Sequence, residues 1–304
     1  MGTIFGQVIT LVAFAAIGYA LAKGGIAKSE HADLLSKLLV YVFVPASAFK
    51  TFSQNFTVSY ISTNYVLILA SLGIIVGLMI LTRIGVLLFC RKSPDRGVYE
   101  YSVIMPNFGY MGYPFVEALY GAMGLMSVMM FCIPMSIYVY TVGYTLLCGS
   151  KANLKNFFNP MMCSLLVGAL LGITGLGAYI PSVAYSIFGS AGSCMGPVSM
   201  LLLGIVLSDY KLPELFKRPS VYIVSLLRIF VIPVAVGSIL LLFKNELLLR
   251  TALVVYCMPC GLNTIVYVKN AGGDCRPGAG LALVSSLLAC LSIPLVLYIF
   301  GISV

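Results

Sequence analysis

The sequence predicts an all-α polytopic membrane protein, and three observations lead to that prediction. Of its 304 residues, 61% are hydrophobic and only 9% are charged, whereas a soluble domain has about 25% charged residues. Several uncharged stretches could hold one or two helices of the roughly 20 apolar residues that cross a bilayer. Short motifs centred on proline also recur between the two halves of the chain. The uncharged stretches are residues 2–22, 51–82, 118–150, 156–208, 251–268 and 277–304.

Turn signals divide the chain into ten predicted transmembrane helices. The first is long and follows no basic residue, which is typical of a membrane span and not of a cleaved signal peptide. The second is the least regular, because only twelve residues separate Lys37 from Lys50. In chain order, the predicted helices lie at 3–22, 34–53, 63–90, 98–120, 122–148, 157–176, 181–208, 219–243, 247–269 and 277–301.

Basic residues are concentrated in alternate connections between these helices. The connections after helices two, four and six carry none, and the one after helix eight carries Lys244 and Arg250. The positive-inside rule therefore places five connections in the cytoplasm and both termini outside, in a multi-pass protein of the plasma membrane. The net charge of +9 reflects this bias; spread over short loops, it indicates no nucleic-acid binding. The basic residues of the predicted cytoplasmic connections are Lys23, Lys28, Arg91, Lys92, Arg96, Lys151, Lys155, Lys211, Lys217, Arg218, Lys269 and Arg276.

Three motifs recur at nearly one offset and predict an internal repeat. Val-Pro-Ala-Ser at 44–47 corresponds to Gly-Pro-Val-Ser at 196–199, Met-Pro at 105–106 to Met-Pro at 258–259, and Ile-Pro at 133–134 to Ile-Pro at 293–294. A unit of five helices is odd in number, so the second copy enters the membrane from the opposite face. Such inverted repeats are typical of secondary transporters. The predicted organisation is a first repeat at 1–148, a short cytoplasmic connection at 149–156 and a second repeat at 157–304.

Two corresponding helices, the fourth and the ninth, are predicted to be broken. The segments are MPNFGYMGYP at 105–114 and CMPCGLNTI at 257–265, and proline within a helix removes a backbone donor and clashes with the preceding turn. Each break leaves a half-helix whose N-terminus carries free N–H groups and partial positive charge at the membrane middle. If the two helices cross, the paired ends form an anion site. The alternative is that these prolines are only packing kinks.

The breaks carry a resemblance to a known family. PNFGYMGYPFVEALYG at 106–121 resembles the fourth-helix signature of the auxin efflux carrier family, in which Pro-Asn precedes Met-Gly-x-Pro. VPASAFKTF at 44–52, GPVSMLLLGIVLSD at 196–209 and PCGLNTIVYVKN at 259–270 resemble the family's second, seventh and ninth helices. The resemblance covers nearly the whole chain. It implies two inverted five-helix repeats, divided into a scaffold part and a transport part.

The resemblance also implies a function. Plant members of that family move the indole acetate anion, and bacterial members are associated with malate, malonate and similar dicarboxylates. The chain lacks the large hydrophilic loop of the long plant carriers, so it is similar to the compact bacterial members. The expected function is secondary active transport of small organic anions by alternating access, with an elevator-type motion. The alternative is a transporter-like membrane sensor or ligand-binding protein without a full transport cycle.

Candidate substrate-binding residues follow from the breaks. Asn107 directly follows Pro106 and Asn263 lies four residues after Pro259, and a carboxamide can both donate and accept hydrogen bonds. The alternative role for each amide is to satisfy backbone groups freed by the break. Gly109 and Gly261 allow close approach of the backbone to a ligand. The remaining candidates are Cys260, Thr264, Ser47 and Ser199, and each serine also has a plain alternative, a bond within its own helix.

Charged residues near the membrane are few. Lys50 and Arg228 are the cationic candidates for contact with an anion, although both could extend to an interface. Glu117 and Asp209 lie toward helix ends, and no Asp or Glu lies within either break, which argues against cation exchange as the main function. The coupling ion, H⁺ or Na⁺, stays open.

Other function classes find no support in the sequence. The pair Cys257 and Cys260 has CxxC spacing but no second pair or nearby histidine, so the nine cysteines are interpreted as apolar filler and no metal site is expected. No phosphate-binding loop and no nucleophile–base set is present, so neither ATP-driven transport nor an enzyme is expected. No cofactor is expected. The expected partners are a small organic anion and the lipid bilayer, and a homodimer is compatible with this fold type.

Overall fold

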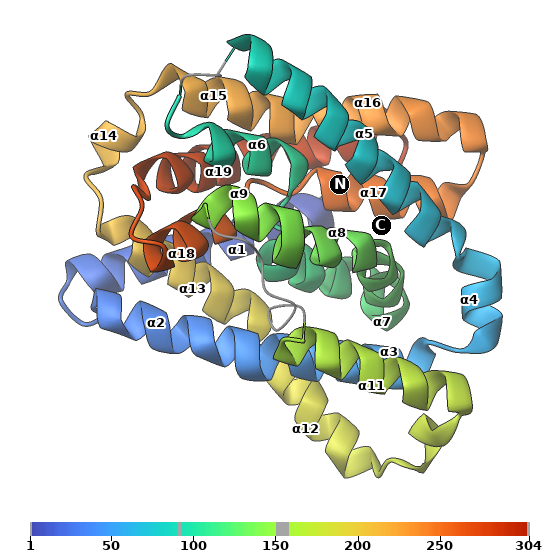
Figure 1. Cartoon of the computed structure of the whole chain (residues 1–304). Coiled ribbons are helices and arrows are strands. Elements are labelled where there is room, and N and C mark those ends of the chain that lie inside the picture. Colours follow the sequence, from blue (N-terminus) through green and yellow to red (C-terminus); the bar gives the residue numbers. More distant parts are fainter. Residues whose placement is uncertain (1, 90–92, 150–157, 303–304) are drawn as a thin grey trace.

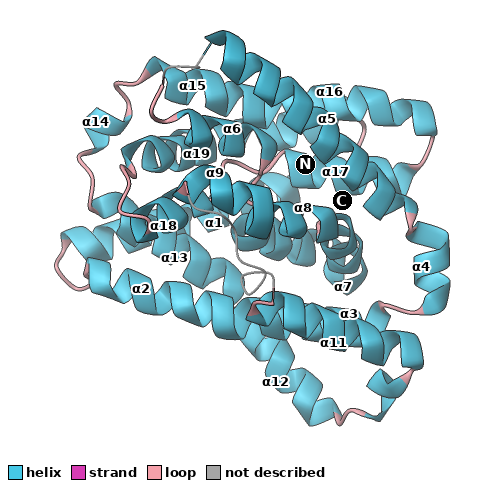
Figure 2. Ribbon diagram, in the orientation of Figure 1, coloured by secondary structure: helices cyan, strands magenta, loops and turns pink. Residues whose placement is uncertain are grey.

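The computed structural model describes residues 2–89, 93–149 and 158–302. Within these ranges all regular secondary structure is helical, and the only β-type contact is one isolated bridge; Figure 2 shows the helices joined by short loops. Seven helical stretches are long and apolar enough to cross a membrane, and 133–148 and 160–174 form shorter apolar helices. The all-α polytopic class is therefore confirmed. Most of the predicted cytoplasmic connection at 149–156 lies outside the described residues.

The first half of the chain contains several π turns and an interruption at residues 105–107. A π turn inserts an extra residue per turn and often accompanies proline or a functional site. One such turn precedes Pro45, and Gly121, with φ of +65°, bends α7 at the predicted boundary between the fourth and fifth helices. The elements are α1 (Gly2–Lys23), α2 (Ser29–Leu38), η1 (Leu39–Phe43), α3 (Val44–Asn55), α4 (Val58–Asn64), α5 (Val66–Phe89), α6 (Arg96–Ile104), η2 (Phe108–Gly112), α7 (Tyr113–Phe131), α8 (Ile133–Tyr138), η3 (Val139–Gly143) and α9 (Tyr144–Cys148).

The second half shows the corresponding features. A helix ends at Tyr256 and the next begins at Asn263, so the predicted ninth helix is interrupted as expected. A π turn again precedes a proline, here Pro233. The elements are α11 (Pro160–Thr174), η4 (Leu176–Tyr179), α12 (Ser182–Ser193), α13 (Met195–Ser208), α14 (Leu212–Leu215), α15 (Pro219–Leu226), η5 (Leu227–Val231), α16 (Ile232–Leu240), η6 (Leu241–Phe243), α17 (Glu246–Tyr256), α18 (Asn263–Asn270) and α19 (Arg276–Ile299).

Helix α1 packs closely and in parallel on α13. A Cβ at Gly196 would lie 3.7 Å from the Leu11 side chain, and one at Gly204 would overlap the Ala15 carbonyl. Farther along, the Lys23 ammonium donates to the Ser208 carbonyl at 2.9 Å. Contacts therefore advance along both helices in the same direction. Small residues allow this approach, and membrane helices associate through such packing because lipid provides no hydrophobic drive.

Helices α3 and α11 form a second parallel pair. A Cβ at Gly168 would meet the Phe49 carbonyl and one at Gly172 the carbonyls of Phe52 and Phe56. Again the contacts advance in the same direction along both helices. In Figure 1, α3, α11 and α12 lie together at one end of the molecule, away from α5, α15 and α16.

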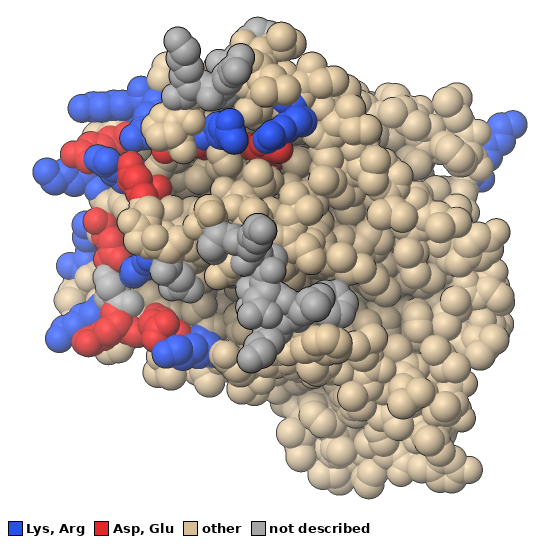
Figure 3. All heavy atoms as spheres, viewed as in Figure 1, with Lys and Arg blue, Asp and Glu red and all other residues tan. Residues whose placement is uncertain are grey.

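Charged groups from distant connections meet at one end of the helices. Arg218 lies 2.7 Å from the Asp95 carboxylate and 3.7 Å from that of Asp274, and Arg276 donates to Asp274 at 2.9 Å. The Arg276 hydrogen bond lowers the pKa of Asp274 below its ordinary value. Figure 3 shows Lys, Arg, Asp and Glu gathered along this side, over α14 and nearby connections. The connections before α6, α15 and α19 therefore share one face.

Segments around α4, the middle of α7 and the start of α17 meet at the opposite end of the helices. The Tyr60 hydroxyl lies 2.7 Å from the Ser127 hydroxyl, which joins α4 to α7. The Arg250 guanidinium lies over the Tyr120 ring, 4.9 Å from its centroid. Between the two ends the surface is apolar: on α5, for example, the exposed side chains include Leu69, Ile80 and Leu81. Such a surface suits the acyl-chain region of a bilayer.

Candidate functional site

The two interruptions meet in the interior of the protein. The Asn107 N–H donates to the Pro259 carbonyl at 2.7 Å, and an isolated antiparallel bridge joins Pro106 to Cys260. Both break prolines are buried. The strands of the breaks therefore satisfy each other's backbone groups, as buried non-helical backbone in a membrane requires. The predicted meeting of the segments at 105–114 and 257–265 is observed, and we call this region the crossing.

Two half-helices begin at the crossing. One starts at Phe108 and continues through α7, and the other starts at Asn263 with α18. No side chain caps either start. In the described part of the chain, no acceptor is recorded for the N–H groups of Phe108, Gly109 and Tyr110, which belong to the first turn. At the start of α18, by contrast, the N–H groups of Thr264, Ile265 and Val266 donate to the carbonyls of Gly261 and Leu262, so the prediction of free N–H groups at both starts is wrong for this one. The N–H groups of the first half-helix and the partial positive charge at its start favour an anion.

The two asparagines differ in their surroundings. Asn107 is 3% exposed, and its carboxamide makes no hydrogen bond to any described residue. Asn263 is half-buried and its amide donates to the Tyr101 hydroxyl at 2.8 Å. Neither carboxamide bonds to a backbone group freed by the break among the described residues. Among the described residues, therefore, the Asn263 amide is held by Tyr101, and the Asn107 carboxamide has no partner.

The two glycines of the crossing have different surroundings. A Cβ at Gly261 would lie 3.6 Å from the Pro106 carbonyl oxygen, in ordinary contact, whereas one at Gly109 would meet nothing within 4 Å. Gly109 therefore leaves open space beside the first free N–H groups. Gly261 lies against the opposing break, where it contributes to the fit of the two segments.

Cys260 and Thr264 are held by interactions within the protein. The Cys260 N–H donates to the Ser285 hydroxyl at 2.9 Å, which anchors the break to α19. The Thr264 hydroxyl donates to the Gly261 carbonyl at 2.9 Å, and Thr264 is fully buried. The Cys260 backbone and the Thr264 side chain therefore both help to shape the crossing. Of the eight cysteines in the described ranges, all are free thiols, Cys257 and Cys260 included.

Ser199 and Ser47 occupy different places despite their matched motifs. The fully buried Ser199 hydroxyl lies 2.6 Å from the Tyr110 carbonyl and 2.9 Å from the Gly196 carbonyl, so it links α13 to the start of η2. Ser47 lies on α3 and faces a small, partly open pocket between α3, α7 and α12. The two serines thus flank α7 and η2 from the two helices that carry the matched prolines.

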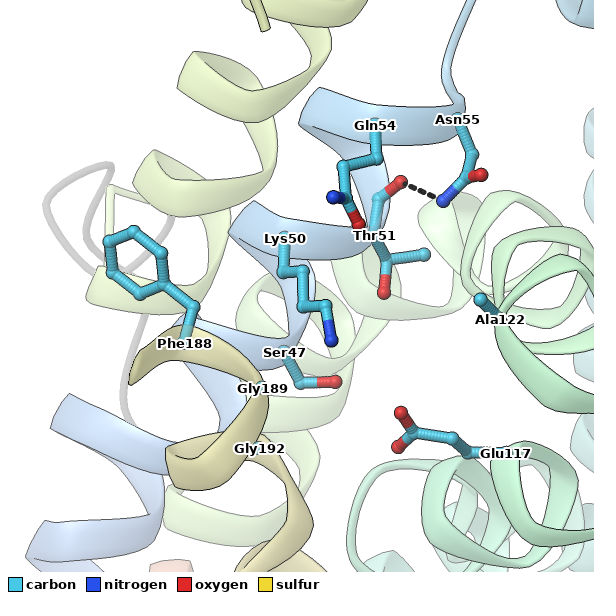
Figure 4. A pocket seen from close by; sticks show the side chains of 10 residues that line it. All are labelled: Ser47, Lys50, Thr51, Gln54, Asn55, Glu117, Ala122, Phe188, Gly189 and Gly192. Atoms are coloured by element: carbon cyan, nitrogen blue, oxygen red, sulfur yellow. Dashed lines mark hydrogen bonds between the residues drawn. The ribbon is translucent and has the colours of Figure 1, made fainter. Parts of the chain in front are cut away.

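Charged and polar side chains converge on this pocket. Figure 4 shows Lys50 from α3 and Glu117 from α7 both directed into it, with Thr51 and Gln54 nearby. A Cβ at Gly189 of α12 would lie 2.6 Å from the Lys50 Nζ, so the ammonium passes close to this helix. In the structure Lys50 is thus directed into the pocket and not outward from the protein. Asp209 caps the end of α13 and is exposed.

Arg228 takes a place that the sequence did not indicate. It is fully buried, and its guanidinium donates to backbone carbonyls at the crossing. Since these donors are already engaged, a direct contact with an anion, as the sequence suggested, is not what the structure shows. Tyr101 and Ser285 were also missed, because a tyrosine or serine inside an apolar helix carries no local sign of its partner.

Comparison with known proteins agrees with this architecture. The profile of a family described as membrane transport protein matches residues 3–154 and 145–297. An uncharacterized transporter of Methanocaldococcus jannaschii is 26% identical over 282 residues, covering 85% of this chain and 86% of the relative. An uncharacterized transporter of Methanothermobacter thermautotrophicus is 23% identical over 300 residues, covering 95% of each. These matches support a transporter and not an enzyme, and the chain belongs to this membrane transport protein family, the family of the auxin efflux carriers that its motifs resemble.

Proposed function

We propose that this protein is a secondary active transporter of small organic anions such as malate or malonate. The observation that carries the proposal is the crossing, where the N–H groups of Phe108, Gly109 and Tyr110 lie beside the Asn107 carboxamide. Within the described ranges, none of these groups has a hydrogen-bond partner. A carboxylate accepts several hydrogen bonds and is favoured by the positive end of a helix. The crossing brings together segments from both halves of the chain, so a ligand bound there contacts both.

Inverted repeats with ten helices are the architecture we propose. The parallel packing of α1 on α13 and of α3 on α11 supports it, because parallel helices are separated by an even number of membrane crossings. In a ten-helix arrangement these pairs are the first with the seventh and the second with the sixth, which an inverted two-fold axis exchanges. Both termini then lie outside and the Asp95–Arg218 face in the cytoplasm, as the positive-inside rule predicts.

The proposed transport cycle is an elevator-type alternating access. Helices α1, α3, α11, α12 and α13 form the scaffold, and the crossing moves against them with α5, α15 and α16. The pocket between α3, α12 and α7 lies at the boundary between these parts and opens toward the end that carries Asn55. We propose that it is the access path on the predicted outer side, with Lys50 attracting an anion. A sensor without a full cycle is the alternative, and no feature of the described structure favours it.

Substrate charge is the first expectation to test. Purified protein in proteoliposomes is expected to take up radiolabelled malonate or malate, and unlabelled malonate to compete far better than malonamide. Charge-assisted hydrogen bonds are roughly twice as strong as neutral ones, so the difference should be large. Assays with a pH or a Na⁺ gradient identify the coupling ion. Equal competition by malonamide would contradict the role of the helix starts, and binding without uptake under either gradient would favour the sensor.

Topology is tested by labelling single cysteines in whole cells. With accessible native cysteines replaced by serine, a cysteine at Asn55 is expected to react with an impermeant maleimide from outside, and one at Lys217 only after permeabilisation. Asn55 ends α3 and Lys217 lies beside the charged face, so the two lie at opposite helix ends. Reaction of both positions in intact cells would overturn the inverted arrangement.

A further inference from the structure

Arg228 is the one cation fully buried in the described part of the chain, and it lies in the π turn η5. Its Nη1 donates to the Val103 carbonyl at 2.9 Å and, less directly, to that of Ile104 at 3.4 Å. Its Nη2 donates to the Tyr256 carbonyl at 2.9 Å, and its Nε lies 3.5 Å from the Met258 carbonyl. A single guanidinium therefore reaches both interrupted helices.

These carbonyls belong to the ends of the two helices that stop at the crossing. Val103 and Ile104 close α6, Tyr256 closes α17, and Met258 lies in the break that follows. The last carbonyls of a helix have no partner within it and carry partial negative charge. Buried without donors, they would each be costly in a membrane. Arg228 supplies donors to both ends at once.

The charge of Arg228 is compensated in an unusual manner. Among the described residues it forms no ion pair with any carboxylate, and its only other charge-related contact is the Tyr256 ring, whose centroid lies 5.1 Å away. A buried charge needs compensation, and here the two negative helix ends provide it. In related constructions, carbonyls at the C-terminal ends of broken helices coordinate Na⁺. In this protein the guanidinium already occupies that position.

We propose that Arg228 is the positioning residue of the crossing, which ties α6 to α17 and replaces an inorganic cation at their carbonyl ends. The crossing then presents only the N-terminal ends of its half-helices to a ligand. The electrostatic field of these ends selects an anion, and no bound metal cation is needed. The positioning role stands on the hydrogen bonds alone. The selection of an anion rests on the proposed function.

Two substitutions of Arg228 separate the effect of its charge from that of its hydrogen-bond donors. Arg228→Lys keeps one positive charge, whereas Arg228→Gln keeps donors without charge. The measurement is the thermal unfolding midpoint in detergent with 0 or about 300 mM NaCl, balanced by choline chloride. Arg228→Gln exposes negative carbonyl ends and is expected to gain roughly 3 °C or more with Na⁺. No such gain is expected for wild type or for Arg228→Lys. The control is Arg250→Met, which is also expected to show no gain, because Arg250 lies over Tyr120, outside the crossing.

A malonate titration of the same samples keeps this inference separate from the proposed function. Wild type and Arg228→Lys are expected to be stabilised by malonate, and Arg228→Gln to lose that response. If wild type shows no malonate response, the proposed substrate class fails, and the Na⁺ comparison still tests Arg228. The inference would be overturned if Arg228→Gln folds but is not stabilised by Na⁺. It would also be overturned if Arg228→Lys shows the same defects as Arg228→Gln. If Arg228→Gln does not fold while Arg228→Lys does, the result supports the inference directly, because folding then requires a positive charge at this position.

Discussion

Replacing Asn107 by alanine is expected to reduce malonate or malate uptake to background while leaving the protein folded. The Asn107 carboxamide is buried beside the free N–H groups of the first half-helix and has no hydrogen-bond partner in the described ranges. Its loss therefore removes a donor to the ligand but breaks no internal bond. A hydrogen bond to a charged group contributes roughly 1.5–3 kcal/mol, which corresponds to about 10- to 150-fold in affinity. Uptake into proteoliposomes and the unfolding temperature are the two measurements.

Asn263 provides the matched comparison from the other half-helix. Asn263→Ala is expected to weaken binding as well, but also to lower stability by roughly 1 kcal/mol, because it leaves the buried Tyr101 hydroxyl without its partner. The double variant should lose less affinity than the sum of the single losses, since residues that share one ligand are not additive. If Asn107→Ala retains wild-type uptake, the crossing is a structural kink and the site lies elsewhere.

Replacing Gly204 by alanine is expected to destabilise the protein more than any exposed helix substitution. A Cβ at this position would overlap the Ala15 carbonyl oxygen and crowd the Tyr19 N–H, both backbone groups that cannot swing aside. Overpacking costs about 1–3 kcal/mol and more where the backbone must move, so α1 and α13 must separate. We expect the unfolding temperature to fall by roughly 5–10 °C.

The control for Gly204 lies on the exposed face of α5. At Gly73 a Cβ would meet nothing within 4 Å, and alanine there restores helix propensity, worth roughly 0.5–1 kcal/mol. Gly73→Ala is therefore expected to be neutral or stabilising. An unfolding temperature of Gly204→Ala equal to that of Gly73→Ala would show that α1 and α13 do not pack as closely as described.

Much of the helical framework was predictable from the sequence because its causes are local. A run of about 20 apolar residues has few alternatives to a membrane helix, and proline disfavours the interior of a helix because it removes a donor and clashes with the preceding turn. The break at Pro106, the break before Asn263 and the bend at Gly121 therefore appear where the sequence predicts them. Even the meeting of the two breaks followed from their matched positions in the two halves.

The contacts that shape the site were decided only by the tertiary structure. Arg228 lies more than a hundred residues from Val103, Asn263 lies as far from Tyr101, and nothing near either residue in the chain indicates those partners. In a membrane interior every buried donor and acceptor must find a partner within the protein, but which partner it finds depends on how helices from both halves pack. Composition and proline positions thus determined the helices and their breaks, whereas packing decided that the Arg228 guanidinium binds the carbonyl ends. Packing also left the N–H groups of Phe108, Gly109 and Tyr110 without an acceptor among the described residues.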